Sequence, residues 1–312
     1  MSDALPAGPL PATEATSPRF AMMDAWPSAD ILDALLEGQM AAVAAVRPAL
    51  PALAAAAEAA ADRLRGGGRL AYAGAGTSGR IGVQDGAELA PTFDWPRDRL
   101  VLLLAGGEAA LTQAVENAED RDDLARGDVA AAGLGPSDVV VGLAASGATP
   151  YTLACLWAGR AAGALTIAVA NSPGAPLLAA ADHAVLIETG AEPIAGSTRL
   201  KAGTAQKVAL NLFSTLLMTR LGRVYQGQMV DMVARNSKLR DRAVRMLQNL
   251  TGCSPDAATA ALSQADGSVK VAVLILHGLS QADAQATLRR HQGQLRWALD
   301  SLNGTTTKSA ET

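Results

Sequence analysis

Two short segments place hydroxyl side chains beside glycines, each directly after an apolar run. Thr77 and Ser78 lie in GAGTSG, and Ser146, Gly147 and Thr149 lie in SGATP. The free N–H groups at a helix N-terminus attract anions, and serine or threonine hydroxyls add neutral donors. Two such loops on one sheet edge can surround a phosphate, whereas a single loop can use its hydroxyls merely to cap its own helix. The pair of loops therefore predicts a phosphate site.

The segment GAGTSG also fits the dinucleotide fingerprint G-x-G-x-x-G. A dinucleotide site needs an acidic residue about 20 residues further on, where the second strand ends. Here the second apolar run ends in AGG, and the nearest acid, Glu108, lies 34 residues after Gly74. The sequence also lacks G-x-x-x-x-G-K-[ST], the pattern that cradles nucleoside triphosphates. We therefore expect no nicotinamide, and no other cofactor is indicated.

The elements that must position these loops are short apolar runs that end in small or polar residues. Five such runs are RLAYAGAG, RLVLLLAGG, DVVVGLAASG, ALTIAVANSPG and ADHAVLIETG. Helical stretches separate the first four, and this alternation is typical of βαβ units in a parallel sheet with helices on both faces. Ligands of such sheets bind at the carboxyl ends of the strands. We predict an α/β, doubly wound domain with its site just after the strands.

Flanking segments have a different character. Residues 1–28 are rich in proline and alanine and are predicted to be an arm with little structure. Ser28 is the expected N-cap of a helical stretch to about residue 65, which Pro48 and Pro51 divide in two. A long buried helix is expected up to Gly222, a linking helix over 237–250, and short helices as far as residue 301. The predicted division is 1–65, 66–225, 226–302 as a small helical bundle, and a flexible tail over 303–312.

Bulk composition excludes several classes of protein. The 312 residues are 49% hydrophobic and 18% charged with a net charge of −4, which gives no basic footprint for nucleic acid. No stretch of 18 uninterrupted apolar residues is present, and the N-terminus lacks the apolar core of a signal peptide. We therefore predict a soluble, cytoplasmic protein that does not bind membranes.

The residues that commonly hold metals are scattered along the chain. Cys155 and Cys253 lie far apart and are expected to be reduced thiols. The three histidines, His183, His277 and His291, belong to no ligand pattern or catalytic triad. The sequence therefore predicts no metal site.

Longer motifs resemble one enzyme family. The segments GRLAYAGAGTSGRIGVQDGAEL, AVENAED, DVVVGLAASGATPY, GSTRLKAGTAQK and YQGQMVDM are similar to those of the N-acetylmuramic acid 6-phosphate etherases. The likeness is dense over residues 60–245 and looser in TEATSP and the C-terminal helices. It implies that residues 66–225 form a sugar isomerase (SIS) domain that binds sugar phosphates. It also implies a homodimeric, metal-free enzyme that releases D-lactate during cell-wall sugar recycling.

The resemblance also assigns roles to individual residues. It implies that Glu88 in DGAELAPT is the catalytic acid and base, with a pKa raised by burial. It implies that Glu119 in AVENAED is the second catalytic glutamate, but Glu116, three residues earlier on the same predicted helix, stays as an alternative. Ser197 and Lys201 in GSTRLK are expected to bind the substrate, with a surface ion pair as the alternative role for Lys201.

Two departures from the family pattern lie close to these residues. The family's D-A-S-E-x-P-P-T stretch has Ala87 in place of serine, and its S-G-R-T-P loop has Ala148 in place of arginine. Loss of a guanidinium beside an anion can weaken binding, so substrate identity stays open. The alternatives are a phosphosugar-sensing regulator without catalysis and an aldose–ketose phosphosugar isomerase.

Overall fold

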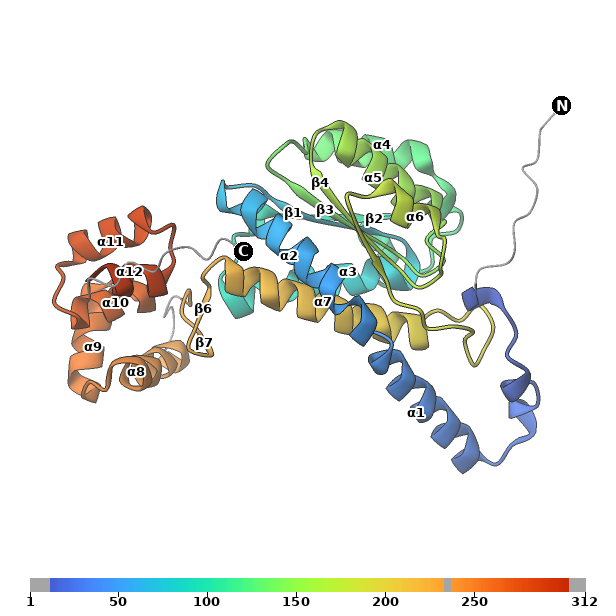
Figure 1. Cartoon of the computed structure of the whole chain (residues 1–312), viewed down its shortest axis with the longest axis horizontal. Coiled ribbons are helices and arrows are strands. Elements are labelled where there is room, and N and C mark those ends of the chain that lie inside the picture. The colour runs from blue at the N-terminus through green and yellow to red at the C-terminus, as the bar shows by residue number, and fades with distance from the viewer. Residues whose placement is uncertain (1–11, 233–236, 303–312) are drawn as a thin grey trace. The chain divides into compact units, whose positions relative to one another are not determined.

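The computed structural model describes residues 12–232 and 237–302, and it contains the predicted sheet (Figure 1). All four pairings are parallel, and the strand order is β2-β1-β3-β4-β5. The strands are β1 (Leu70–Gly74), β2 (Leu100–Leu104), β3 (Val139–Ala144), β4 (Leu165–Ala170) and β5 (His183–Leu186). The predicted α/β class is confirmed. The expected tail over 303–312 lies outside the described residues.

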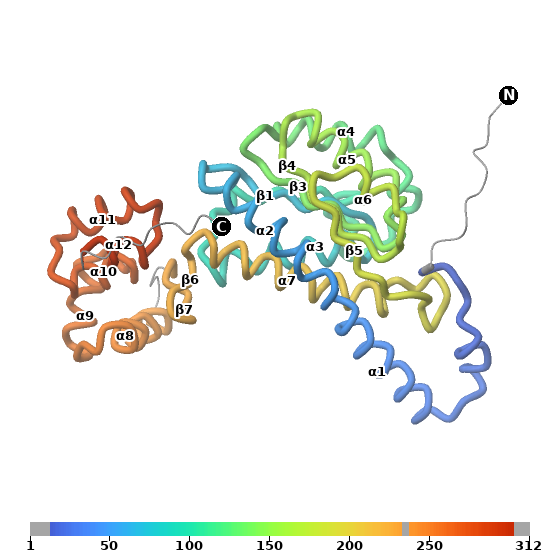
Figure 2. The backbone as a smooth tube through the Cα atoms, in the orientation of Figure 1, coloured from blue at the N-terminus to red at the C-terminus, as the bar shows by residue number. Residues whose placement is uncertain are grey.

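Helices cover both faces of this sheet, as Figures 1 and 2 show. Helix α2 (Leu50–Arg65) covers one face, and α4 (Asp122–Ala132), α5 (Pro150–Ala161) and α6 (Pro176–Ala180) cover the other. Small residues let these layers approach closely: a Cβ on Gly142 of β3 would lie 2.9 Å from Leu156 Cγ in α5. The alanine-rich, aromatic-poor composition therefore suits a closely packed α/β core.

A buried polar cluster ties two further helices to β1. Helix α3 (Gly76–Phe93) carries Asp85, whose carboxylate accepts hydrogen bonds from Tyr72 Oη at 2.7 Å and Ser214 Oγ at 3.1 Å. Ser214 lies in α7 (Lys201–Arg220), the long helix that the sequence predicts. Burial raises the pKa of Asp85, although these hydrogen bonds and the charge of Lys207 oppose that shift. The cluster fixes this part of α3 against β1 and α7.

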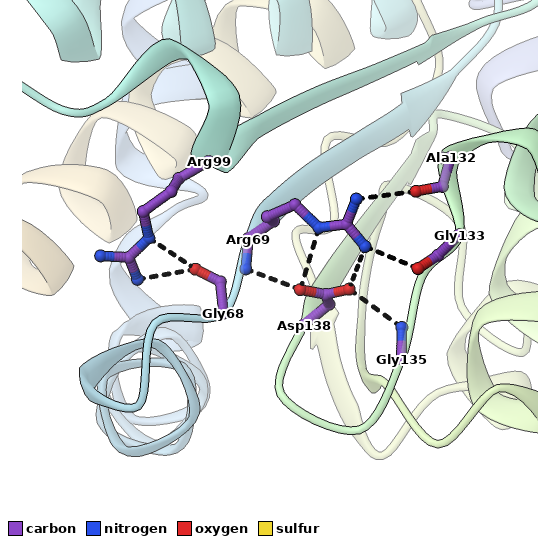
Figure 3. Close-up of polar contacts among 7 residues, drawn as sticks. All are labelled: Gly68, Arg69, Arg99, Ala132, Gly133, Gly135 and Asp138. Atoms are coloured by element: carbon purple, nitrogen blue, oxygen red, sulfur yellow. Dashed lines mark hydrogen bonds and ion pairs between the residues drawn. The ribbon is translucent and has the colours of Figure 1, made fainter.

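The amino ends of the strands are joined by an ion pair (Figure 3). The Arg69 guanidinium contacts Asp138 Oδ2 at 2.7 Å and donates to the carbonyl oxygens of Ala132 and Gly133, also at 2.7 Å. Backbone N–H groups of Arg69 and Gly135 donate to the same carboxylate. Burial alone would raise the pKa of Asp138, but these hydrogen bonds outweigh it and lower that pKa. This pair stabilises the sheet at the edge opposite to the predicted site.

Replacement of Asp138 is expected to destabilise the fold in a pH-dependent way. Asp138→Asn should lower the free energy of unfolding at pH 7 by about 3 kcal/mol, because the guanidinium loses a buried partner. The folded-state pKa of Asp138 lies below its unfolded value, so this contribution is complete at neutral pH and is lost as the pH falls through the folded pKa. Urea unfolding at pH 7 and near pH 3 should show that the difference in free energy of unfolding between wild type and variant is smaller at the lower pH.

A matched control is Asp62→Asn, because Asp62 pairs with Arg65 but its side chain is 74% exposed. Exposed pairs contribute about 0–1 kcal/mol, so this variant should unfold almost like the wild type. Equal losses in the two variants would show that the pair at Asp138 has no special role.

The N-terminal part has more structure than the sequence suggests. Short 3-10 turns occur at Ala12–Glu14, Pro18–Phe20 and Met23–Ala25, so the expectation of an unstructured arm is wrong for residues 12–26. Helix α1 (Ser28–Ala44) begins at Ser28, whose expected capping role is not observed because Pro27 holds the cap position. A further 3-10 turn, Arg47–Ala49, separates α1 from α2 at the predicted proline break.

The helical stretch Ser28–Arg65 is long and apolar enough, by length and composition, to cross a membrane. The apolar character of its second half is explained by packing in the protein core, because Ala56, Ala57, Ala60 and Ala61 of α2 are completely buried. The property is therefore weak support for a membrane span.

The chain divides into two compact units, and the second contains the C-terminal helices. A small hairpin, Val224–Tyr225 with Gln228–Met229, precedes five helices. These are α8 (Ser237–Thr251), α9 (Pro255–Gln264), α10 (Val269–Leu276), α11 (Gln281–Arg290) and α12 (Leu295–Leu302). Ser254 caps α9 by accepting a hydrogen bond from Ala257 N, with Pro255 as the first helical residue. The linking helix and the short helices are thus present, whereas the hairpin was not predicted.

Candidate functional site

The two hydroxyl-bearing loops follow neighbouring strands. β1 pairs with β2 on one side and with β3 on the other, and Gly74 at the end of β1 is in register with Leu143 of β3. The chain moves to β2 and then returns past β1 to β3, so the strand order reverses between β1 and β3. Such a switch point opens a crevice at the carboxyl edge of an α/β sheet. The loops after β1 and β3 therefore lie where a ligand is expected.

The turn from β1 into α3 requires its glycines. A Cβ on Gly79 would lie 2.7 Å from Gly74 O, so the helix could not approach the strand so closely with a larger residue. In this turn Thr77 is half-buried and Ser78 is buried. Neither hydroxyl makes a hydrogen bond within the described parts of the chain. Both are therefore available to a ligand at the N-terminus of α3.

The loop from β3 into α5 is arranged in a similar way. Gly147 has φ +67, and a Cβ there would lie 2.3 Å from Ala175 Cβ, so only glycine fits. Ser146 Oγ accepts a hydrogen bond from Ala148 N at 3.2 Å. Thr149 is the N-cap residue of α5, but its side chain makes no capping hydrogen bond. Capping alone therefore does not account for the Thr149 hydroxyl.

The connection from β5 into α7 reaches the first of these loops. A Cβ on Gly203 would lie 3.4 Å from Thr77 Cγ2, so the start of α7 is close to the β1–α3 turn. Ser197 lies earlier in this connection, half-buried, and its hydroxyl makes no hydrogen bond within residues 12–232 and 237–302. Thr77 and Ser197 thus belong to neighbouring segments of one sheet edge.

The N-terminus of α7 is already occupied by an internal carboxylate. Glu192 is completely buried and accepts hydrogen bonds from Lys201 N and Ala202 N, each at 2.9 Å. Lys201 Nζ donates to Ala191 O at 2.9 Å, so its ammonium group is used within its own loop. By contrast, no side-chain carboxylate within the described residues accepts a hydrogen bond from the N-terminus of α3 or α5. Sequence reasoning missed Glu192, although it lies just before GSTRLK.

The connection after β2 differs from the predicted helix. Glu119 lies in a 3-10 turn, Ala118–Asp120, and another such turn spans Glu108–Leu111, so the expectation that Glu116 and Glu119 share one helix face is wrong. Arg80 of α3 donates to the carbonyl oxygens of Ala110 at 2.8 Å and Gln113 at 3.1 Å. Those oxygens would otherwise accept helical hydrogen bonds, which explains why no α-helix forms before Asp122.

Glu116 and Glu119 are both exposed, and a left-handed residue at position 117 lies between them. Asn117 has φ +57, and the buried Ala118 anchors the turn that carries Glu119. Arg80, which sequence reasoning left without a role, holds the preceding part of this connection against α3. Glu119 therefore lies in a loop at the same sheet edge as Thr77.

Glu88 is placed differently. It is exposed, so the expectation that this side chain is buried is wrong for the single chain. Two residues earlier on the same helix, a Cβ on Gly86 would lie 3.0 Å from Leu100 Cδ1 at the start of β2. Ten residues of α-helix separate Glu88 from Ser78, which is about 15 Å along the helix axis. Along α3, Glu88 is thus about three helical turns further from the helix N-terminus than Ser78.

Two buried side-chain amides form hydrogen bonds at the carboxyl edge of the sheet. Gln206 Nε2 of α7 donates to Asn171 Oδ1 at 2.9 Å, and Asn171 Nδ2 donates to Ile187 O at 3.0 Å. Asn171 directly follows β4, and both amides are completely buried. The pair joins α7 to the ends of β4 and β5. A glutamine and an asparagine inside apolar segments are a signal that sequence reasoning did not use.

Neither cysteine forms a disulfide. Cys155 is buried and Cys253 is half-buried, and both are free, as the sequence predicts. Burial raises the pKa of the Cys155 thiol to about 12, so it stays protonated at neutral pH. Within residues 12–232 and 237–302, no group of three histidine, cysteine or carboxylate side chains is arranged to hold a metal ion.

This chain is similar to several named proteins. A family model described as the glucokinase regulatory protein N-terminal SIS domain matches residues 51–159. An N-acetylmuramic acid 6-phosphate etherase of Deinococcus radiodurans is 53% identical over 288 residues, covering 92% of this chain and 94% of that protein. The protein of the same name from Streptomyces avermitilis is 47% identical over 289 residues, covering 92% and 93%. A solved phosphoheptose isomerase from Francisella tularensis is 20% identical and covers 62% of this chain and 100% of its own, with a TM-score of 0.48.

Proposed function

Because the chain belongs to the N-acetylmuramic acid 6-phosphate etherase family, we propose that it cleaves the D-lactyl ether of that sugar phosphate. The products are N-acetylglucosamine 6-phosphate and D-lactate. The observation that carries the proposal is the pair of loops after β1 and β3, with the free hydroxyls of Thr77, Ser78 and Thr149 at the switch point. These neutral donors and the N-termini of α3 and α5 suit a phosphate. Residues 66–225 form the sugar-phosphate domain in this proposal.

The chemistry is that of a carbon–oxygen lyase. In the ring-opened sugar, the C1 aldehyde acidifies the C2 proton, which Glu119 removes. Glu88 then protonates the ether oxygen at C3, so that D-lactate leaves and a C2–C3 double bond forms. Water adds at C3 with Glu88 as the base, and C2 regains a proton, in a reversal of the elimination. No hydride or electron is transferred, so the scheme requires no redox cofactor.

The positions of the two glutamates support a homodimer in which each site is shared. Glu88 lies about 15 Å further along α3 than Ser78, whereas Glu119 lies in a 3-10 turn of the connection after β2. We assign Glu88 to the site of the partner subunit. Helix α1 offers a surface for pairing, because Leu32, Leu36, Met40 and Val43 recur every three or four residues and are 49% to 68% exposed.

Location and competing functions follow from the same reasoning. A substrate that is already phosphorylated is found inside cells, so we place the enzyme in the cytoplasm. A phosphosugar-sensing regulator would bind the sugar without releasing lactate. An isomerase would shift the carbonyl group and leave the ether intact.

The test is incubation of the purified protein with N-acetylmuramic acid 6-phosphate, followed by enzymatic measurement of D-lactate and by proton NMR of the sugar. We expect equal amounts of lactate and N-acetylglucosamine 6-phosphate. Unphosphorylated N-acetylmuramic acid should react far more slowly, because it cannot use the hydroxyl loops. Binding without lactate release would favour the regulator, and a ketose product would favour the isomerase.

A further inference from the structure

The N-terminal segment contacts the connection that precedes α7. Gly196 N donates a hydrogen bond to Thr13 O at 3.1 Å. The Glu14 carboxylate lies against the same glycine, since a Cβ on Gly196 would be 2.8 Å from Glu14 Oε2. Gly196 has φ +75, a conformation that side chains other than glycine rarely adopt. Because residue 196 has no side chain, the backbone of Thr13 and the carboxylate of Glu14 can both lie against it.

Glu14 follows an anchored stretch of backbone, and no cationic side chain within the described residues pairs with its carboxylate. Its side chain is exposed, and it has no ion pair or hydrogen bond within the part of the chain that the structure describes. The preceding residue, Thr13, is 0% exposed, and its Oγ1 has no hydrogen-bond partner. A surface glutamate normally follows a mobile backbone, but here the residue before it is buried and bonded to Gly196. The backbone next to Glu14 is thus anchored, and the acceptor positions of its carboxylate are free.

The connection that receives Glu14 leads directly to the phosphate loops. Thr198 O accepts a hydrogen bond from Gly203 N at 2.8 Å, and Gly203 is the residue that lies against Thr77. A series of contacts therefore runs from Glu14 through Gly196 and Thr198 to Thr77. A carboxylate repels a phosphate but accepts strong hydrogen bonds from hydroxyl and amide N–H groups. Its charge suits the sugar and not the phosphate.

We propose that Glu14 is a substrate-binding residue that accepts hydrogen bonds from the neutral O–H and N–H groups of the sugar. The inference rests on the proposed function, because it takes the phosphate to be held by the loops after β1 and β3. The negative charge of Glu14 would also keep the lactyl carboxylate away from this end of the site. Glu14 thus sets substrate orientation and favours amino sugars over bare phosphate.

The experiment compares Glu14→Ala with Glu37→Ala in the full-length protein. Glu37 is a matched control, because it is another exposed N-terminal glutamate and it pairs with Arg19. We expect Glu14→Ala to raise KM for N-acetylmuramic acid 6-phosphate about tenfold or more, as for loss of a charge-assisted hydrogen bond, while kcat changes less. Calorimetry should show a similar loss of affinity for N-acetylglucosamine 6-phosphate. Inhibition by inorganic phosphate should be unchanged.

The outcomes separate the two levels of the proposal. If Glu14→Ala binds the sugar phosphates as Glu37→Ala does, the role of Glu14 is wrong while the etherase function stands. If its affinities for inorganic phosphate and sugar phosphate fall equally, Glu14 merely supports the loop, and the proposal is again overturned. A wild-type protein that neither binds nor cleaves the sugar would refute the proposed function, and the role of Glu14 with it.

Discussion

Replacing Glu88 by glutamine should abolish D-lactate release while leaving the first proton transfer intact. A glutamine cannot protonate the departing oxygen, and loss of a general acid costs about 10²- to 10⁴-fold in rate. In the proposed mechanism the other glutamate removes the C2 proton, so the variant should still exchange that proton with solvent. Proton NMR of N-acetylmuramic acid 6-phosphate in D₂O measures both events in one sample. Full retained turnover would remove Glu88 from the mechanism.

The distance between Glu88 and Ser78 along α3 makes this variant useful in a second way. If each site combines Glu119 of one subunit with the partner's Glu88, a dimer of one Glu88→Gln and one Glu119→Gln subunit has one intact site and one doubly defective site. Co-expression of differently tagged subunits should then restore about a quarter of wild-type activity, because about half of random dimers are hybrids. Each variant alone should stay inactive. A mixture that also stays inactive would place both glutamates in the same subunit.

The strands and the hydroxyl loops could be predicted from the sequence because their signals are local. Each strand is a short apolar run bounded by glycine or polar residues, and a parallel sheet binds ligands at its carboxyl edge whichever residues fill it. The order β2-β1-β3 then brings the two loops together. Even the spacing of Gly74 and Gly79 has a local cause, since the turn between them leaves no room for a Cβ.

The missed features depend on contacts between residues far apart in the chain. An α-helix is expected around Glu119 because helical stretches alternate with the strands, but Arg80 binds the Ala110 and Gln113 carbonyl oxygens from 30 and 33 residues away. Nothing in the local pattern shows that competition. The docking of Thr13 onto Gly196 likewise joins residues from opposite ends of the domain, in a segment whose composition indicates an arm without structure.

The position of Glu88 illustrates a further limit of the sequence. Family resemblance implies a catalytic role for Glu88, and helix geometry places it about 15 Å from Ser78 along the axis of α3. A motif names the participants in a reaction but does not state which subunit supplies each one. Within a single chain, Ser78 and Glu88, which the proposed chemistry requires in one site, lie about 15 Å apart along α3.

Replacing Glu119 by glutamine should stop the reaction one step earlier. Without a base at C2, both solvent exchange of that proton and lactate release should fall by about 10²- to 10⁴-fold. Glu116→Gln is the matched control, because Glu116 is equally exposed in the same connection but precedes the left-handed Asn117 and the buried Ala118 that fix Glu119. We expect Glu116→Gln to retain most activity. If Glu116→Gln instead loses proton exchange at C2 while Glu119→Gln stays active, Glu116 is the base and Glu119 is not. The base must lie within hydrogen-bond reach of the C2 proton.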